Sequence, residues 1–374
     1  MRMMPISQCQ PGMRLAKSIF SDEGIVLLAE GVELTGAFIR RLHEHGFRYL
    51  YVQDPRFDDV RIPEPISEAT RRKALNAVRN AFREFAEQPG RRRAYSYPYI
   101  ARDIREAVDM IIDDLYRSED AMIMLMNLQT VDHYLYTHSV NVCVYGTILG
   151  IARGYTREEL FTFSMGALLH DIGKTQISMD VLLKPGKLTK EEFEVMKRHT
   201  ERGFYLLKDE PGIPLLAAHC ALQHHERLDG SGYPRGLRGD EIHEYAKLIG
   251  IVDSYDAMTS YRVYRDPMLP HEAVEHLYAG SGTLYDTELL QLFRDKVAIY
   301  PIGLTVQLSS GHTAVVVDIN AKCAHRPVVR LLTDEEGKPL REPWDLDLSK
   351  QLNVTVTKVL FDEEEAERKN SVLV

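Results

Sequence analysis

Residues 97–295 carry the apolar periodicity of one helix after another, which restricts the middle of the chain to a bundle of helices. Two S/T-x-x-E capping boxes mark helix starts within this stretch, Thr156 with Glu159 and Thr189 with Glu192. We therefore predict a mainly α fold whose centre is an all-helical bundle.

The segments on either side of the bundle have a different sequence pattern, with short apolar stretches typical of strands. The N-terminal part combines short apolar strands with a helix through Leu42, which Gly46 ends, and a strand at 49–52. After the bundle, strand patterns appear at 304–308 and 313–319, and the chain finishes in an acidic tail. The predicted domains are a small α+β N-terminal module at 1–55, a charged and partly helical linker at 56–96, the helical domain at 97–295 and a β-rich C-terminal extension with its acidic tail at 296–374.

The charge balance limits the partners. The chain has 46 basic and 55 acidic residues, a formal net charge of −9. Domains that bind nucleic-acid polymers are usually basic, so we do not expect such a polymer as a partner. A small anionic substrate stays compatible with this charge, because a local arginine pair can hold one.

The start of the sequence and its cysteines indicate a cellular location. Four scattered cysteines, without a CxxC motif, are typical of reduced thiols rather than of disulfides or a zinc ribbon. We find no signal-peptide pattern and no run of eighteen apolar residues. We expect a cytoplasmic protein without a membrane segment.

The residues that indicate chemistry all lie in the helical stretch. They are imidazoles and carboxylates that come from several predicted helices, and facing helices of a bundle build metal sites in this way. A single histidine in a helix is usually an ordinary residue, so the prediction depends on the set. The candidate metal ligands are His138, His170, Asp171, His199, His224, His225 and Asp253.

Imidazole and carboxylate ligands without thiolate suit first-row metals such as iron, manganese, nickel or zinc. Five histidines and two carboxylates exceed the needs of one tetrahedral ion. Two ions that share Asp171 would use all of them. Two such ions can bind a phosphate and share an activated water.

Two stretches carry the strongest local signals. His170-Asp171 closes an apolar run, where a carboxylate is costly to bury unless it is paired or bound to a cation, and Gly173 and Lys174 follow directly. His224-His225 precedes a glycine-rich loop whose backbone could approach a ligand, although the loop alone is equally compatible with a surface turn.

The order of these motifs resembles the HD-GYP family over roughly residues 95–300. The matching residues are His138, His170-Asp171-x-x-Lys174, His199, His224-His225-Glu226, Asp229-Gly-x-Gly232-Tyr233-Pro234 and Asp253 with Asp256. The resemblance implies an all-helical HD-type domain that hydrolyses cyclic di-GMP at a centre of two or three metal ions. It also implies that iron or manganese is the metal.

The resemblance further implies a role for each matching residue. His138, His170, Asp171 and Asp253 would hold one ion, and His199, His224 and His225 the second, with Asp171 bridging. Lys174 would act near the scissile phosphate, stabilising charge or protonating the leaving oxygen. The substrate-binding residues would be Gly232, Tyr233 and Pro234 of the loop, with Arg262 and Arg265 on the phosphate oxygens.

One departure from the family pattern affects the metal count. Three-metal members have a glutamate one helical turn before the first histidine, where this chain has Tyr134, a poor ligand. We therefore expect two divalent ions. Tyr261 stands where relatives commonly have aspartate, and we attach no consequence to it.

The predicted function is a metal-dependent cyclic di-GMP phosphodiesterase whose product is pGpG or, where pGpG is cut again, GMP; the sequence leaves this choice open. Two alternatives stay open: a non-catalytic receptor for the cyclic dinucleotide, and a hydrolase of another cyclic dinucleotide such as cyclic GMP-AMP. The Gly-Tyr-Pro loop argues against a guanosine polyphosphate as substrate. A homodimer through the helices near 70–115 is also expected.

Overall fold

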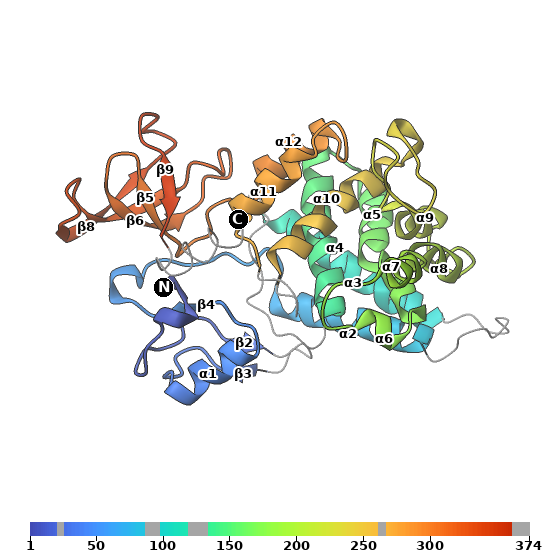
Figure 1. The fold of residues 1–374 in the computed structure, drawn as a ribbon, viewed down its shortest axis with the longest axis horizontal. Coiled ribbons are helices and arrows are strands. Elements are labelled where there is room, and N and C mark those ends of the chain that lie inside the picture. The colour runs from blue at the N-terminus through green and yellow to red at the C-terminus, as the bar shows by residue number, and fades with distance from the viewer. Residues whose placement is uncertain (21–25, 87–97, 119–133, 261–266, 361–374) are drawn as a thin grey trace. The chain divides into compact units, whose positions relative to one another are not determined.

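The computed structural model describes residues 1–20, 26–86, 98–118, 134–260 and 267–360. These residues form two compact units (Figure 1). One unit is built from residues 1–63 and the described residues after 296, and the other from the described residues between 64 and 296. The second unit is therefore inserted in the sequence between the two parts of the first.

The inserted unit is helical, which confirms the predicted fold class. Its helices are α2 (Glu68–Ala86), α3 (Pro98–Arg117), α4 (Tyr134–Arg153), α5 (Arg157–Leu169), α6 (Met179–Leu182), α7 (Lys190–Lys197), α8 (His199–Leu207), α9 (Leu215–Gln223), α10 (Glu244–Thr259), α11 (Pro270–Ala279) and α12 (Thr287–Lys296). Two short 3-10 helices, η3 (Ile172–Gln176) and η4 (Gly239–Glu241), join them.

Helix α4 lies at the centre of this unit. Every residue from 137 to 150 is buried, as expected of a helix that is apolar on all sides. It packs against α5 and α10, and α5 packs against α9, which contacts α8 (Figure 1). The ends of α5, α8 and α9 and the middle of α4 and α10 thereby face one buried region.

Both predicted capping boxes are present. The Thr156 side chain accepts from the Glu159 backbone N–H, and the Glu159 carboxylate accepts from the Thr156 N–H at 2.8 Å. The same reciprocal pair joins Thr189 and Glu192 at the start of α7. Each box satisfies backbone donors that a helix start leaves unpaired, so these helices begin where the sequence predicts.

The linker predicted at 56–96 contains a helix of the inserted unit. Helix α2 buries Ala74, Val78 and Phe82, and it packs against α3 and α4. Charged residues occupy its other face, which gives the segment its polar composition. The polar composition thus describes one face of a packed helix.

The other unit contains strands from both ends of the chain. Its N-terminal part has β1 (Arg2–Pro5), η1 (Ile6–Gln8), β2 (Ile19–Phe20), β3 (Val26–Leu28), α1 (Gly36–Glu44), β4 (Tyr49–Val52) and η2 (Pro55–Phe57). Its C-terminal part has β5 (Thr305–Leu308), β6 (Thr313–Asp318), β7 (Val328–Thr333), β8 (Pro339–Asp347) and β9 (Val356–Val359). The predicted α+β N-terminal part and β-rich C-terminal part are both confirmed.

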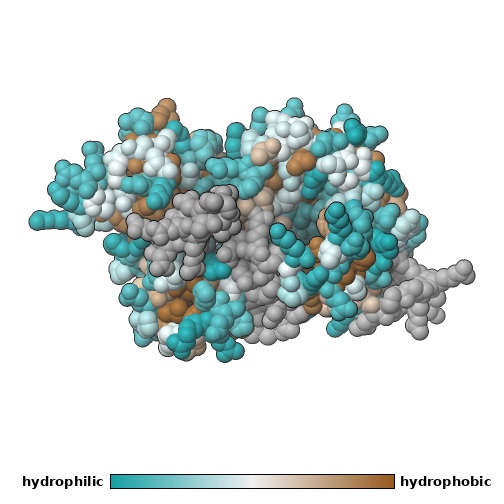
Figure 2. Space-filling view, viewed as in Figure 1, coloured by the Kyte–Doolittle hydropathy of each residue, from teal (hydrophilic) through white to brown (hydrophobic). Residues whose placement is uncertain are grey.

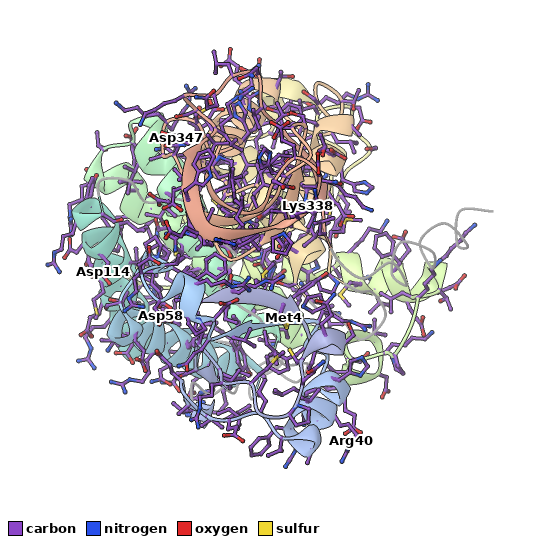
Figure 3. All side chains as sticks on the ribbon, turned by 90° about the vertical axis from the view of Figure 1, so that its left-hand side faces the viewer. Met4, Arg40, Asp58, Asp114, Lys338 and Asp347 are labelled. Carbon is purple, nitrogen blue, oxygen red and sulfur yellow. The ribbon has the colours of Figure 1, made fainter. Side chains whose placement is uncertain are left out.

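The C-terminal strands form one antiparallel sheet in the order β8-β7-β6-β5-β9, while β1 pairs with β4 and β2 with β3. Asp347 lies at the end of β8 (Figure 3). Its carboxylate accepts hydrogen bonds from the Ser349 backbone N–H and the Asn320 side-chain amide. Asn320 follows β6, so this carboxylate holds the β6–β7 connection to the end of β8.

Alternate residues of β6 pack into two different cores. Val316 belongs to a cluster that includes Met3 and Tyr51, whereas Val315 belongs to a cluster that includes Phe57. Successive side chains of a strand point to opposite faces, so the N-terminal segment covers both faces of this sheet. The backbone N–H of Met3 also donates to the Gly303 carbonyl at 2.9 Å.

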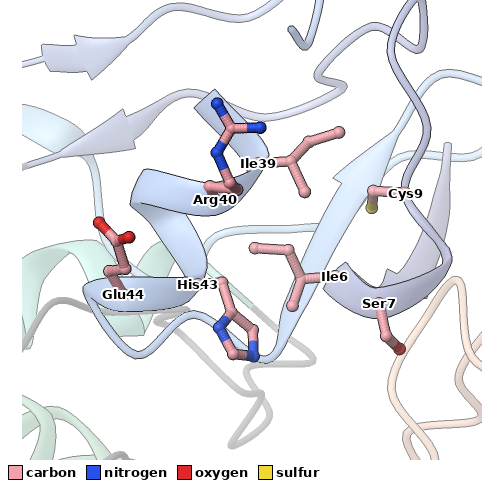
Figure 4. Close-up of a pocket in the computed structure, with 7 residues that line it drawn as sticks. All are labelled: Ile6, Ser7, Cys9, Ile39, Arg40, His43 and Glu44. Atoms are coloured by element: carbon pink, nitrogen blue, oxygen red, sulfur yellow. The ribbon is translucent and has the colours of Figure 1, made fainter. Parts of the chain in front are cut away.

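Two surface features complete the description. A shallow pocket in the N-terminal part is lined by Ile6, Ser7, Cys9, Ile39, Arg40, His43 and Glu44 (Figure 4). In the helical unit, hydrophobic side chains reach the mostly hydrophilic surface in patches (Figure 2). Among the described residues, no helix is long and apolar enough to cross a membrane.

Candidate metal centre

The buried region of the helical unit contains all seven predicted ligands. His138 comes from α4, Asp253 from α10 and His199 from the first position of α8. His170 and Asp171 follow the last residue of α5, and His224 and His225 follow the last residue of α9. His225 is partly exposed, and the other six are buried.

A glycine lets the helix ends approach one another. A Cβ on Gly173 would lie 1.9 Å from the carbonyl oxygen of His199 and 2.5 Å from the backbone nitrogen of Gly203. No side chain fits between η3 and α8 at this point. The glycine of the His-Asp-x-Gly sequence therefore brings Asp171 and His199 together.

The first group of ligands surrounds one oxygen of Asp171. The Oδ2 atom lies 3.4 Å from His170 Nε2 and 3.7 Å from His138 Nε2. Asp253 Oδ1 lies 3.0 Å from the same His138 nitrogen and 4.0 Å from His170 Nε2. The donor atoms of His138, His170 and Asp171 thus lie within 4.8 Å of one another, and Asp253 approaches both histidines.

The second group surrounds the other oxygen of Asp171. The Oδ1 atom lies 3.4 Å from His199 Nε2 and 3.8 Å from His224 Nε2, and these two nitrogens are 3.4 Å apart. The donor atoms of Asp171, His199, His224 and His225 all lie within 4.8 Å of one another. Asp171 therefore belongs to both groups and offers one oxygen to each.

Backbone carbonyls fix the orientation of three of the rings. The Nδ1 atom lies 2.7 Å from the Ala167 oxygen in His170, 2.7 Å from the Met196 oxygen in His199 and 3.0 Å from the Ala221 oxygen in His224. With Nδ1–H as the donor in each pair, Nε2 keeps its lone pair and faces the centre. Histidines that bind metals are commonly held by such a bond from the other ring nitrogen.

Burial and neighbouring charges set the protonation of the cluster. Burial lowers the pKa of His199 to about 4, and burial together with neighbouring histidines holds the pKa of His224 and His225 well below its usual range. These three rings are therefore neutral at neutral pH, as metal ligands must be.

In the two carboxylates, burial and the neighbouring charges shift the pKa in opposite directions, and the charges prevail. Burial alone would raise the pKa of Asp171, but Lys174 and the neighbouring histidines outweigh it and hold that pKa well below its usual range. Asp253 follows the same pattern through His138 and His225. Burial also opposes protonation of His138, yet hydrogen bonds to Asp253 and Asp256 raise its pKa to about 9.

The donor set fits a metal centre. His170 Nε2 and Asp171 Oδ1 are buried without a hydrogen-bond partner among the described residues. Buried polar atoms of folded proteins are nearly always satisfied, so an orphaned nitrogen in the first group and an orphaned carboxylate oxygen in the second are what a cation in each group would satisfy. Neutral imidazole and ionised carboxylate are the ligands that divalent first-row ions accept.

Lys174 and the Gly-Tyr-Pro loop border this cluster. The Lys174 ammonium donates to Asp171 Oδ2. The Tyr233 ring lies 4.7 Å from the His225 ring, centroid to centroid, and its backbone N–H donates to the His225 carbonyl at 3.2 Å. A Cβ on Gly232 would lie 2.5 Å from that carbonyl oxygen, so only glycine fits there. Pro234 follows a cis peptide bond.

Some predicted residues lie outside the described part of the chain. These are Arg262, Arg265 and Tyr261, together with the side chain of Tyr134. The roles assigned to the two arginines and the metal count inferred from Tyr134 therefore stay predictions.

Two further carboxylates support the candidate site, and the sequence analysis assigned no function to either. Asp256 is buried; its Oδ2 lies 2.7 Å from His138 Nδ1, and its Oδ1 accepts from Asn141 at 2.8 Å. Glu226 is buried and accepts from the backbone N–H groups of Arg235 and Leu237 at 2.8 and 3.0 Å, which anchors the Gly-Tyr-Pro loop. A signal existed for Asp256, because it follows Asp253 by three residues and shares its helix face.

A helical bundle that buries two imidazole–carboxylate groups around a shared aspartate defines a metal-binding helical domain. Residues 123–289 match the family model of the HD domain, and residues 305–368 match that of a KOW domain associated with the HD domain. This chain is an HD domain protein related to the HD-GYP cyclic di-GMP phosphodiesterases.

Three curated relatives illustrate the relationship. Cyclic di-GMP phosphodiesterase PA4108 of Pseudomonas aeruginosa is 35% identical over 62% of this chain and 56% of its own length. A cyclic di-GMP phosphodiesterase of Thermotoga maritima is 40% identical over 48% of this chain and 49% of its own. The 3'3'-cGAMP-specific phosphodiesterase 2 of Vibrio cholerae is 31% identical over 50% of this chain and 36% of its own. The matched part spans about half the length of the first two relatives.

Proposed function

We propose that this chain is a metal-dependent phosphodiesterase that hydrolyses cyclic di-GMP to pGpG and then to GMP. The observation that carries the proposal is the buried cluster in which Asp171 turns one oxygen toward His138 and His170 and the other toward His199 and His224. A shared carboxylate of this kind suits two ions that act on one phosphate.

His138, His170, Asp171 and Asp253 would hold the first ion, and Asp171, His199, His224 and His225 the second. Iron and manganese both accept this ligand set. When bound, such ions polarise a phosphate ester and acidify water. A mononuclear site would leave half of these buried donors without a role.

The remaining residues act on the substrate. Lys174 places a positive charge beside Asp171, where it can stabilise the phosphate and deliver a proton to the leaving oxygen. The Gly-Tyr-Pro loop lines the substrate site through Tyr233, and Gly232 permits the close approach of its backbone. Arg262 and Arg265 bind phosphate oxygens. We place the protein in the cytoplasm as a homodimer through the helices near 70–115.

Cyclic GMP-AMP is the second candidate substrate, because one relative is named for that dinucleotide. The two substrates differ in one base, and the phosphate chemistry at the cluster is the same for both. A third candidate function is a non-catalytic receptor, which would bind the dinucleotide without cutting it.

The test combines elemental analysis of freshly purified protein with chromatography of digests of cyclic di-GMP and cyclic GMP-AMP. We expect about two ions per chain, a linear product from cyclic di-GMP and slower cleavage of cyclic GMP-AMP. Faster cleavage of cyclic GMP-AMP would reassign the substrate. Bound metal with both substrates intact would favour the receptor, and protein that binds no first-row metal would contradict the proposal altogether.

A further inference from the structure

Helix α7 carries an aromatic side chain between the solvent and the metal cluster. Phe193 is 45% exposed, and its ring centroid lies 6.1 Å from that of Tyr233 at an interplanar angle of 83°. The Tyr233 ring in turn lies 4.7 Å from the His225 ring at 31°. Two aromatic rings thus lead from the surface to a candidate metal ligand.

A lysine lies against both of these rings. Lys197, one helical turn after Phe193, places its Nζ atom 5.4 Å from the Phe193 centroid and 5.8 Å from the Tyr233 centroid. Its ammonium also pairs with Glu194 Oε1 at 2.5 Å. Cations within about 6 Å of an aromatic face are attracted to it, so this ammonium is held in the angle between the rings.

The start of α7 is held firmly. Glu192, next to Phe193 in the chain, accepts from the Thr189 backbone N–H at 2.7 Å and from Lys184 Nζ at 2.8 and 2.6 Å. The reciprocal capping box fixes the first turn of the helix. Phe193 is therefore presented on a preorganised helix rather than on a loop.

Single exposed aromatic side chains are common and need no explanation. Phe193 differs because its neighbours connect it to the cluster and because a cation lies beside it. Nucleobases stack on aromatic side chains, and lysine donates to the O6 and N7 acceptors of guanine. An exposed ring with an adjacent ammonium offers both contacts next to a centre suited to phosphate.

We propose that Phe193 and Lys197 form a nucleobase subsite, in which a guanine base of the nucleotide stacks on Phe193 and accepts a hydrogen bond from Lys197. The inference rests on the proposed function for the identity of the nucleotide. It assigns base recognition to α7, whereas the cluster and Lys174 act on the phosphate.

The test is equilibrium binding of GMP to the metal-loaded protein, which needs no turnover. Phe193→Ala should weaken GMP binding about 5- to 100-fold, and Phe193→Tyr should retain it, because a base–aromatic stack is lost in one and kept in the other. The matched control is Tyr205→Ala. Tyr205 is 63% exposed on α8 and has Lys208 Nζ 5.2 Å from its ring, and its loss should leave GMP binding unchanged.

Metal content, measured in every variant, separates base binding from a role in supporting the Tyr233 loop. If Phe193→Ala loses metal, Lys197→Met decides: GMP binding weakened several-fold with full metal content supports the subsite, and unchanged binding overturns it. Unchanged GMP binding in Phe193→Ala also overturns it, as does a wild-type protein that does not bind GMP. Wild-type protein that binds GMP through Phe193 but leaves cyclic di-GMP intact would remove the proposed function and keep the subsite.

Discussion

At the scale of single residues, Asp171 and Lys174 are expected to contribute separately to metal binding and to the reaction. Asp171 is buried and belongs to both ligand groups, whereas Lys174 is partly exposed and donates a hydrogen bond to Asp171. Removal of a shared ligand should abolish metal binding, while removal of a neighbouring cation should affect the reaction alone.

We therefore expect Asp171→Ala to lose bound metal and phosphodiesterase activity together. Lys174→Ala should keep its metal and turn over about 100-fold or more slowly, the usual contribution of a positioned proton donor. Elemental analysis and product chromatography on both variants check this, with the exposed Asp180→Ala as control. Full activity in Asp171→Ala would refute the shared-ligand assignment, and unchanged turnover in Lys174→Ala would remove the role of the lysine.

Asp256 carries the second prediction at this scale. Its carboxylate lies 2.7 Å from His138 Nδ1, so it orients a ligand without facing the centre itself. Loss of such an outer partner typically costs 10- to 100-fold in metal affinity or activity. We expect Asp256→Asn to weaken metal affinity by roughly that factor while the helical content stays unchanged. Competition with a chelator measures the affinity, and an unaltered value would show that the contact has no role in orienting His138.

At the scale of elements, the site depends on how closely η3 approaches α8. Both elements are short, and their separation is set by Gly173, where even a methyl group would overlap the His199 carbonyl. The same close approach recurs at Gly232, the glycine of the Gly-Tyr-Pro loop. Glycine is needed at these positions because two backbone segments approach closely there, and not because the backbone has a positive φ angle.

Gly173→Ala should separate η3 from α8 and thereby misplace Asp171 relative to His199. We expect loss of most of the bound metal and a lower melting temperature, because overpacking a close contact costs about 1–3 kcal/mol or more. The control is Gly36→Ala at the start of α1, where the nearest atom to a Cβ would lie at 3.7 Å. Normal metal content in Gly173→Ala would mean that the two elements tolerate a wider spacing.

At the scale of the whole molecule, the chain folds as two units, one of which is made from both of its ends. Arg330 of β7 joins these ends: its guanidinium pairs with Asp59 at 2.7 Å and with Asp345 of β8 at 2.6 Å, and it donates to the Arg56 carbonyl. Its side chain is only 13% exposed. A planar, multiply donating group is needed here, which lysine cannot replace.

Arg330→Met should destabilise the unit that contains the sheet by about 1–3 kcal/mol at neutral pH, and metal content should stay normal because the cluster lies in the other unit. The hydrogen bond from Arg330 lowers the pKa of Asp59 to about 2 from 3.8. This contribution is therefore present above pH 3.8 and lost as the pH falls toward 2. Thermal unfolding at several pH values, with exposed Arg341→Met as control, should show the difference shrinking over that window. A difference independent of pH would argue against the ion pair.

The sequence by itself determined the helical bundle and the set of histidines and aspartates that the fold buries together. Helix periodicity, capping boxes and the motif around His170-Asp171 are local patterns, and the ordered set of histidines and aspartates, rather than any one of them, indicated the site. For the same reason the strands at both ends of the chain were predictable as strands.

Only the tertiary structure decided what lies far apart in sequence but close in space. It places Asp256 behind His138, Phe193 against Tyr233, and the N-terminal segment on both faces of the C-terminal sheet. Helix α2 lies in the segment predicted as a linker, and the structure shows that it is part of the helical core. Each of these outcomes depends on which surfaces pack together. The free energy of that packing is shared among contacts between residues far apart in the sequence, which no local sequence pattern encodes.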